Sequence, residues 1–411
     1  MVDPRPTTSR RVLITGISSP VGGQLAQRLE PDPQVETIIG VDTSDPQHQL
    51  ERTEFVRVDA ERVQLRRILS AAAIDTVVDT RLVCDPFGAG GRSATKINVA
   101  GTAEVVAACA ESGSTVRKLV FKSSAHWYGF SSDDPAFFSE ATTPRRAPGS
   151  GIEGDAVRAE EIVRQFAVRG SGRMATMLRL ADVLCGEERT SHTTLFSLPV
   201  VPAILGFDPR WQFIHQHDVV GALAHATLHA LPGSYNAAAD GVLVLSEIAS
   251  LLGKPALPLL PPFGAGFAAD QLRRVGLPVP VDLVRQLRFG RGLDNRRLKA
   301  AGYVYRYTSR EAVLKLRAQQ RLRPLLESGS GAYRYEPEVE AFLRRSPSVQ
   351  APARPLPTGF DDLAADELIG IASSLEPSAL AELRRHEAAT RSRREVLVAL
   401  DGMLQRAQKP Q

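Results

Sequence analysis

The chain has 411 residues, of which 43% are hydrophobic and 23% are charged, a balance typical of a folded globular protein rather than a disordered or fibrous one. Its formal net charge is only +4, and its length favours one large domain with an appendage. No apolar run is long enough to cross a bilayer, since the most hydrophobic segment, 257–267, is interrupted by prolines. The opening residues, MVDPRPTTSRR, lack the apolar core of a secretory signal. The cysteines at 84, 109 and 185 fit neither a disulfide framework nor a zinc site, so we expect a cytoplasmic protein.

A short apolar strand over 11–15 runs into a loop that contains glycine. The loop reads Gly16-Ile-Ser-Ser-Pro-Val-Gly22-Gly23 and is followed by a helical pattern over 24–29. A strand, a glycine turn and a helix in this order can hold a pyrophosphate at the helix N-terminus, where free N–H groups and the helix dipole attract an anion. A glycine-rich loop alone is a weak signal, so the residues that follow decide the interpretation.

The second strand, 37–41, ends at an acidic residue. Asp42 lies at the distance at which a carboxylate accepts a hydrogen bond from the 2′-hydroxyl of an adenosine ribose and repels a 2′-phosphate. The position therefore favours NAD over NADP. The alternative is that Asp42 is an ordinary turn residue at the end of a strand.

Strands and helices continue to alternate through the first half of the chain. Further strands are predicted at 55–59, 76–79 and 118–122, with helices at 64–72 and 98–112. Alternation with elements of these lengths predicts an α/β fold with a Rossmann-like, doubly wound parallel sheet and right-handed crossovers.

Several motifs occur in order between residues 10 and 320. They are Thr15-Gly16 with Gly22, Asp42, Asp59, Asn98-Val-Ala-Gly101-Thr102, Ser123-Ser124-Ala-His-Trp-Tyr128-Gly129, Leu178-Arg179-Leu-Ala-Asp182-Val-Leu-Cys-Gly186, Gln212-Phe-Ile-His215-Gln-His-Asp218-Val, and Gly233-Ser-Tyr-Asn236. Each alone could arise by chance, whereas their order and spacing together are specific. The chain resembles the extended short-chain dehydrogenase/reductases of the NAD-dependent epimerase/dehydratase type, most closely an actinobacterial branch that is UDP-glucose 4-epimerase-like.

The resemblance implies a cofactor, a ligand class and a role for each motif residue. The cofactor would be NAD, and the ligand a nucleotide sugar or another small molecule that carries phosphate. The implied cofactor-binding set is Gly16, Ser19, Gly22, Asp42, Asp59 and Asn98, with the glycines at the pyrophosphate, Asp42 at the ribose and Asp59 near the adenine. Ser124 would be the catalytic residue that hydrogen-bonds the reacting sugar oxygen.

The proton-transfer pair of the family is missing. The resemblance implies a tyrosine and, four residues later on the same helix face, a lysine that lowers the tyrosine pKa so that the phenolate can take a proton as hydride leaves. When Glu160-Glu161 is aligned with the acidic end of the matching helix, Ile152 stands at the tyrosine position and Ala156 at the lysine position. Sliding the alignment does not restore the pair, because 123–253 contains no lysine and 129–234 contains no tyrosine.

Two further departures lie beside the expected cofactor. Ser19 stands where the family has the middle glycine of the loop, and its side chain is expected to crowd the pyrophosphate. Asp79-Thr-Arg-Leu82 stands at the end of the fourth strand, where the family has small residues.

Replacement groups are available near the expected site. Glu153, Asp155 and His126 are close to it in sequence, and a histidine titrates near neutral pH. A histidine at a strand end is more often structural, so catalysis by His126 is the less favoured alternative.

Two histidine pairs are candidate metal ligands. His215 and His217 are expected to alternate on one strand, and His225 and His229 lie one helical turn apart. Neither pair has a carboxylate at the spacing of a metal site, so no metal is predicted.

The segment 285–323 is strongly basic, with twelve lysines and arginines opposed only by Asp294 and Glu311. These residues form either solvated helix faces or a surface that attracts phosphates, anionic lipid or an acidic partner. Aromatic residues are sparse among them, so nucleic acid is the least favoured partner. The resemblance gives such arginines a role at the diphosphate of a nucleotide sugar.

The expected organisation has four parts. A flexible N-terminus covers 1–10, and the main domain covers 11–325, with a dinucleotide-binding core at about 11–183 and a substrate subdomain at about 184–325. A proline-rich linker at 326–357 leads to a helical hairpin at 358–408. The hairpin is too small to fold alone and should dock on the main domain or on a protein partner. A homodimer is also compatible with the resemblance.

Two functions follow. The first is a non-catalytic or atypical NAD-binding protein, and the missing pair favours it slightly. The second is an active NAD-dependent epimerase, dehydratase or reductase of nucleotide sugars that uses a substitute acid/base. A third possibility is that even cofactor binding is lost. The sequence therefore leaves open whether the protein is an enzyme and whether it still binds its cofactor.

Overall fold

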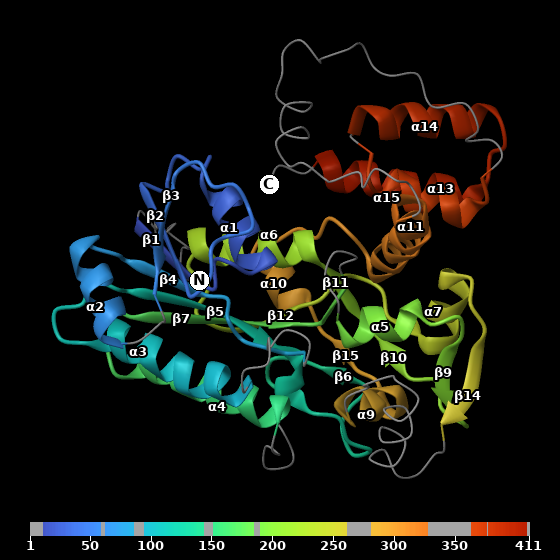
Figure 1. The fold of residues 1–411 in the computed structure, drawn as a ribbon. Helices are drawn as coiled ribbons and strands as arrows, with labels where there is room; N and C mark the ends of the chain where they lie inside the picture. Colours follow the sequence, from blue (N-terminus) through green and yellow to red (C-terminus); the bar gives the residue numbers. More distant parts are fainter. Residues whose placement is uncertain are drawn as a thin grey trace.

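The structure is a computed structural model that describes residues 11–58, 62–85, 94–143, 151–184, 190–260, 281–327, 363–375 and 377–408. The expected flexible N-terminus, most of the expected linker, and Asp59 lie outside the described residues. Figure 1 shows a central sheet with helices on both sides and a further group of helices formed by the C-terminal segment.

A seven-stranded parallel sheet forms the centre of the molecule, with strand order β12-β7-β5-β4-β1-β2-β3. Its strands are β1 (Arg11–Thr15), β2 (Thr37–Asp42), β3 (Thr53–Arg57), β4 (Thr76–Asp79), β5 (Lys118–Ser124), β7 (Met174–Leu180) and β12 (Gly233–Ala237). The order reverses at β1, so the connections after β1 and β4 leave the sheet in opposite directions and open a crevice at the carboxyl ends of these strands. The predicted doubly wound α/β fold is confirmed.

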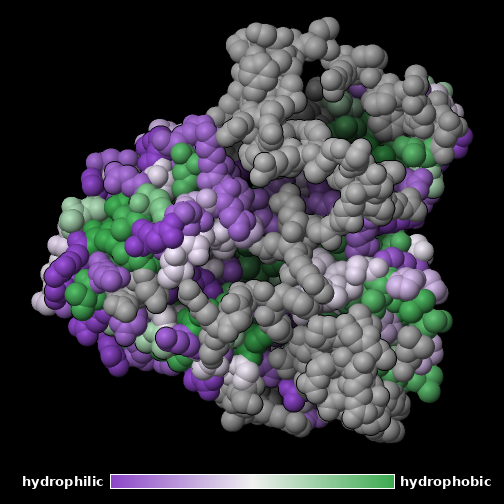
Figure 2. Space-filling view, in the orientation of Figure 1, coloured by the Kyte–Doolittle hydropathy of each residue, from purple (hydrophilic) through white to green (hydrophobic). Residues whose placement is uncertain are grey.

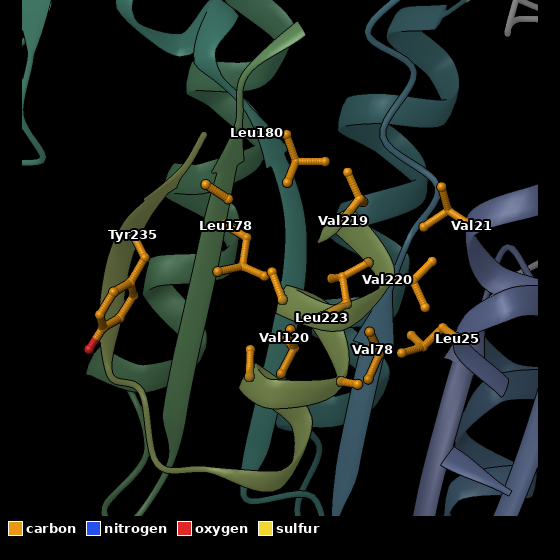
Figure 3. Close-up of a cluster of buried hydrophobic side chains, with 14 of the residues drawn as sticks. Val21, Leu25, Val78, Val120, Leu178, Leu180, Val219, Val220, Leu223 and Tyr235 are labelled. Carbon is orange, nitrogen blue, oxygen red and sulfur yellow. The ribbon is translucent and has the colours of Figure 1, made fainter. Parts of the chain in front are cut away.

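Two layers of helices cover the sheet (Figure 1). One layer contains α1 (Pro20–Leu29) and α6 (Gln216–Leu228), which pack against each other. The other contains α2 (Arg62–Ala71), α3 (Thr102–Ala110) and α4 (Ile152–Val168). Figure 3 shows how sheet residues such as Val78, Val120 and Leu178 meet Leu25 of α1 and Leu223 of α6 in the first layer.

Two of the expected helices begin at other residues than predicted, and local sequence explains the start of α1. Helix α1 starts at Pro20, four residues earlier than expected, because Ser19 caps it: Ser19 Oγ accepts a hydrogen bond from Gly22 N at 3.1 Å. Proline suits the first helical position, where its missing N–H is not needed. The helix expected over 98–112 is a π-helix, η2 (Lys96–Gly101), which continues into α3.

The second half adds short two-stranded sheets and helices beyond the carboxyl edge of the main sheet. The strand pairs are β8 (Asp182–Leu184) with β11 (Phe213–His215), β9 (Val201–Ile204) with β14 (Ala256–Leu260), β10 (Arg210–Trp211) with β13 (Leu243–Val244), and β6 (Phe137–Phe138) with β15 (Gly292–Leu293). The helices are η3 (Ala125–Tyr128), α5 (Ser191–Ser197), α7 (Leu245–Leu252), α9 (Val281–Phe289), α10 (Arg296–Ala300) and α11 (Ser309–Glu327). Residues of α5, β9, β10, β11, α7, α9 and α11 build a second hydrophobic core that contains Trp211 and Phe213. The buried hydrophobic residues of η3, β6, β15 and α10 belong to the core of the main sheet.

The C-terminal segment contains three helices where a pair was expected: α13 (Ala365–Ala372), α14 (Pro377–Ala389) and α15 (Arg394–Gln408). The expected second helix is divided because Ser392 has a φ of +48°, and Arg393 turns back to place its guanidinium on Glu387 at 2.9 Å. Helices α14 and α15 form a hairpin, and α13 packs on α11.

The C-terminal helices dock on the main domain, which is one of the two expected arrangements. Leu368, Leu383 and Leu400 are fully buried in the same core as Leu314 of α11. Arg406 of α15 adds an ion pair to Glu311 of α11 at 2.6 Å. The apolar face of this segment is therefore satisfied within the chain.

The surface is mixed. On the face drawn in Figure 2, hydrophobic residues gather around α2, where Val63 is 56% exposed, and hydrophilic residues cover the region around β3. Within the described ranges, no helix has the length and apolar character needed to span a membrane.

Candidate functional site

A cleft of about 1450 Å³ follows the carboxyl edge of the central sheet. It extends from Asp42 at the end of β2, past the loop between β1 and α1, to residues that follow β4, β5 and β7. This is the crevice that the reversal of strand order creates, and in open α/β sheets ligands bind there. The predicted cofactor residues Gly16, Ser19 and Asp42, and the predicted catalytic Ser124, all line it.

The loop between β1 and α1 requires two of its glycines. Gly16 has a φ of +82°, a conformation that L side chains rarely adopt. A Cβ atom on Gly22 would lie 2.2 Å from Gly16 O. The loop therefore brings the N-terminus of α1 to the edge of the cleft, the place where this kind of fold binds a pyrophosphate.

Ser19 takes a position that the sequence did not predict. Its φ of −73° is ordinary, and its Oγ donates to Gly16 O at 2.7 Å while accepting from Gly22 N. Because the hydroxyl is turned back into the loop, the side chain braces the turn, and the expected crowding of the pyrophosphate does not follow from its orientation.

Asp42 ends β2 and lies at the end of the cleft that is farthest from Ser124. Its carboxylate accepts hydrogen bonds from Ser18 N at 3.0 Å and Thr43 N at 2.7 Å. These bonds fix the half-buried carboxylate beside the glycine loop and leave further lone pairs for a ligand hydroxyl. The apolar residues Val58 and Val63 line the same end.

Asn98 is fully buried and acts on the backbone. Its Oδ1 accepts from Val83 N at 2.7 Å and its Nδ2 donates to Val83 O at 2.9 Å. These bonds hold the segment 82–85, which lines the cleft. Its observed contacts thus support the wall of the site.

The segment after β4 carries the predicted bulky departure. The Arg81 side chain donates two hydrogen bonds to Asp79, from Nε at 2.9 Å and from Nη2 at 2.9 Å. The same side chain packs closely on the glycine loop, since a Cβ added to Gly16 would lie only 2.8 Å from Arg81 Cγ. Burial of Asp79 opposes its ionisation, but the charge and hydrogen bonds of Arg81 prevail and lower the pKa of Asp79. The guanidinium is thus held against the floor of the cleft.

Ser124 and His126 form a pair at the β5 end of the cleft. Ser124 Oγ and His126 Nδ1 are 2.8 Å apart, and His126 N donates to the same Oγ at 3.2 Å. Burial lowers the pKa of His126 to about 3, and the positive charge of Arg291 contributes in the same direction. A general base works best with a pKa near the operating pH, so His126 is poorly suited to the role that the resemblance gives to a tyrosine.

Sequence reasoning missed a polar group on the far side of Ser124. Asp182 and His192 both line the cleft, with His192 Nε2 at 3.8 Å from Asp182 Oδ2, and Arg291 Nη2 is 3.7 Å from Asp182 Oδ1. Burial would raise the pKa of Asp182, but the nearby His192 and Arg291 lower it. Asp182 belongs to the motif that begins at Leu178, whereas no motif or spacing around His192 predicted a place in the site.

The helix expected to carry the proton-transfer pair presents no phenol or amine to the cleft. Ile152 begins α4 and is half-buried, and Ala156 is 1% exposed and packs in the core with Trp127 and Phe138. Neither lines the cleft. Glu160, which set the alignment, is fully buried and accepts two short hydrogen bonds from Arg179.

The two carboxylates considered as substitutes are used within the fold. Asp155 is 1% exposed and accepts from Arg158 Nη2 at 2.7 Å. Glu153 lies 3.7 Å from Arg285 of α9. Neither lines the cleft.

Lys122 is an amine that sequence reasoning passed over. It lies on β5 two residues before Ser124 and lines the cleft with it. Burial raises the pKa of the neighbouring Cys84 thiol, and the Lys122 ammonium opposes that rise, which places the charge close to Cys84. The sequence does contain a signal for Lys122: side chains two residues apart on a strand share a face, so residues 122 and 124 are expected on the same side of the sheet.

The histidine pairs take structural positions. His215 ends β11 and caps α6, so the prediction that His215 and His217 share a strand face is wrong: the chain turns into a helix at Gln216. His225 and His229 stack with ring centroids 4.2 Å apart at the end of α6. In the part of the chain that the structure describes, no group of three or more His, Cys, Asp or Glu side chains is placed to hold a metal ion.

Several members of the basic segment form ion pairs with other described residues. Arg296 binds Asp294, Lys299 binds Asp240, and Arg310 lies between Glu247 and Asp366. These three charges are therefore engaged within the fold. Arg291 is the member that lies next to the cleft residues, since it donates to Ala125 O and stacks on Phe130.

A crevice of the dinucleotide-binding type, with a glycine loop, an acid at the end of β2 and a serine at the end of β5, indicates the class of protein. Residues 12–238 match the NAD dependent epimerase/dehydratase family, and the chain belongs to that family. The uncharacterized protein Rv0501 of Mycobacterium tuberculosis (strain ATCC 25618 / H37Rv) is 33% identical over 315 residues, which cover 75% of this chain and 83% of that protein. Rv2047c from the same strain is 27% identical over 253 residues, 61% of this chain and 24% of that protein.

Solved structures of similar fold support the same class. MoeE5 in complex with UDP-glucose and NAD superposes with a TM-score of 0.55 at 21% identity, covering 77% of this chain and 99% of that one. The UDP-glucose 4-epimerase of Thermus thermophilus in complex with NAD gives a TM-score of 0.56 at 19% identity, covering 76% and 99%. At these identities the likeness establishes the fold.

Proposed function

We propose that this protein binds NAD along the cleft and a nucleotide sugar, or another phosphate-bearing small molecule, beyond Ser124, without the proton transfer of its family. The adenosine would lie between Val58, Val63 and Asp42, and the pyrophosphate at the N-terminus of α1. NAD supplies hydride acceptance when bound. The supporting relatives bind such ligands: MoeE5 is described with UDP-glucuronic acid and NAD, and the Bacillus cereus UDP-glucuronic acid 4-epimerase likewise.

The observation that carries the proposal is the contrast between the two sides of the cleft. On the cofactor side, Gly16 at a φ of +82°, the close contact at Gly22 and the oriented Asp42 support a binding site for the dinucleotide. On the side of α4, the positions assigned by resemblance to the tyrosine and the lysine hold Ile152 and Ala156, whose side chains cannot exchange a proton. Among the described residues that line the cleft there is no tyrosine.

The alternative is an active enzyme with a substitute acid/base, and one observation favours it. Ser124 and His126 are hydrogen-bonded to each other and lie in the cleft with Asp182. The low pKa of His126 weakens this interpretation, since such an imidazole holds a proton poorly at neutral pH.

One experiment separates the possibilities. The purified protein is titrated with NAD by calorimetry and then incubated with NAD and a panel of UDP- and dTDP-sugars. NAD binding without turnover supports the proposal. Turnover that is lost in Ser124→Ala, with NAD binding retained, supports the alternative, and absence of NAD binding refutes both.

A place in the actinobacterial branch is part of the same proposal, supported by the mycobacterial relatives.

A further inference from the structure

The half-buried Lys122 on the central strand β5 needs an explanation. Strands of a parallel sheet are covered on both faces and are normally apolar, and the neighbours Leu119, Val120 and Phe121 are fully buried. A lysine is seldom placed there without a partner, because removing its ammonium from water is unfavourable. No hydrogen bond or ion pair joins Lys122 to another of the described residues.

The acids nearest to this charge are already engaged. Asp85 and Asp182 both act on Cys84, as Lys122 does. Asp85 accepts from Ser191 N at 2.8 Å, and Asp182 accepts from Gln286 and faces Arg291. The Lys122 ammonium therefore remains available to a molecule in the cleft.

The position on the strand selects which part of the ligand it meets. Successive strand residues rise about 3.3 Å, so Lys122 lies about 7 Å behind Ser124 on the same face of β5. Ser124 is at the substrate end, and the glycine loop and Asp42 mark the pyrophosphate and adenosine. Lys122 and Ser124 lie on β5, which β4 separates from β1 and its glycine loop. A dinucleotide whose pyrophosphate is at that loop would reach the cleft-lining Lys122 with its nicotinamide half by crossing β4.

From this placement we infer that the Lys122 ammonium binds the nicotinamide half of NAD, at the ribose hydroxyls or the adjoining phosphate oxygens. The inference rests on the proposed function. It places a positive charge for the cofactor on strand β5, whereas Ala156 on α4 supplies none. The cradle could then retain NAD after the pair on α4 had been lost.

The test compares NAD with AMP, a probe that lacks the nicotinamide half. Both are titrated by calorimetry into the wild type, Lys122→Met, Lys122→Arg and Lys299→Met. Lys299 is a matched control, since it is paired with Asp240 outside the cleft. Loss of a hydrogen bond from a charged group should weaken NAD binding of Lys122→Met by about 10- to 100-fold. AMP binding should stay unchanged, Lys122→Arg should recover part of the affinity, and Lys299→Met should match the wild type.

The outcomes separate the inference from the proposal beneath it. If the wild type binds NAD and Lys122→Met binds it equally well, the inference is wrong while the proposed function stands. If Lys122→Met binds NAD and UDP-glucose normally but loses UDP-glucuronic acid, the lysine binds a substrate carboxylate, and the inference is also wrong. Equal weakening of AMP and NAD would show damage to the whole cradle and contradict the inference. If the wild type binds no NAD, both fail.

Discussion

The buried ion pair between Glu160 and Arg179 gives the sharpest test of how α4 is held beside the cleft. Arg179 donates to Glu160 from Nε at 2.9 Å and from Nη2 at 2.7 Å, and Ser123 Oγ donates to the same carboxylate at 2.5 Å. Both charged side chains are at most 2% exposed. The pair joins α4 to β7 and β5 at the level of Ser124.

Removing one partner should cost far more than removing both. Glu160→Ala leaves the Arg179 guanidinium buried without its counter-charge, which typically costs about 3–5 kcal/mol. That is a large fraction of the roughly 5–15 kcal/mol by which domains are stable. The double variant Glu160→Leu/Arg179→Met replaces the pair by apolar groups of similar volume and should be less destabilised than Glu160→Ala, because no unpaired charge remains.

The assay is the free energy of unfolding from urea titration, with an adjacent glutamate as control. Glu161 is exposed and pairs with Arg164 at 2.6 Å, so Glu161→Ala should cost less than about 1 kcal/mol. Equal stability of Glu160→Ala and Glu161→Ala would refute the reasoning. So would a double variant whose loss of unfolding free energy equals the sum of the losses of Glu160→Leu and Arg179→Met measured separately.

Three further predictions concern the loop, the pH response and the C-terminal helices. Gly22→Ala forces a Cβ to 2.2 Å from Gly16 O and should abolish NAD binding in calorimetry, whereas Gly370→Ala, whose new Cβ would make its nearest contact at an ordinary 3.6 Å, should bind NAD normally; equal binding by both would contradict the close contact. The folded-state pKa of His126 is about 3, below the unfolded value of about 6.5, so only the unfolded state takes up this proton as the pH falls below 6.5. Stability from this group is complete above that value, and the wild type should lose about 2 kcal/mol more than His126→Asn between pH 7 and 5 in urea titrations; parallel pH profiles would show that the imidazole is not shielded. Leu383→Ala should cost about 2–5 kcal/mol because Leu383 is fully buried in the shared core, whereas Val398→Ala, at a side chain 65% exposed, should change stability little; a tolerated Leu383→Ala would mean that the segment does not dock.

The central sheet was predictable because its signals are local. Each strand is a short apolar run, and the alternation with helices restricts the topology to a parallel, doubly wound sheet. The glycine loop was predictable for the same reason, since Gly16 and Gly22 are required by the backbone itself. The place of Asp42 and Ser124 at the cleft was predictable because each is the last residue of a strand that ends there.

The remainder of the site depends on contacts between distant residues. The orientation of Ser19 follows from its hydrogen bonds to Gly16 and Gly22, not from its residue type. His192, in the first turn of α5, lies close to Asp182 of β8, and no spacing rule encodes that approach. The wrong strand assignment at His217 has a physical cause, because His215 Nδ1 accepts from His217 N and starts a helix. The division of the last helix depends on the pair formed by Glu387 and Arg393.

The central claim is that the cofactor cradle persists while the proton-transfer pair is absent, and one measurement tests it directly. The NAD-loaded protein is mixed with UDP-glucose or UDP-glucuronic acid, and the near-ultraviolet absorbance of reduced nicotinamide is followed over the first turnover. We predict that NAD stays bound and oxidised. Rapid formation of bound NADH at neutral pH would contradict the claim, because hydride would then leave the sugar with Ile152 and Ala156 at the positions that the resemblance assigns to the tyrosine and the lysine.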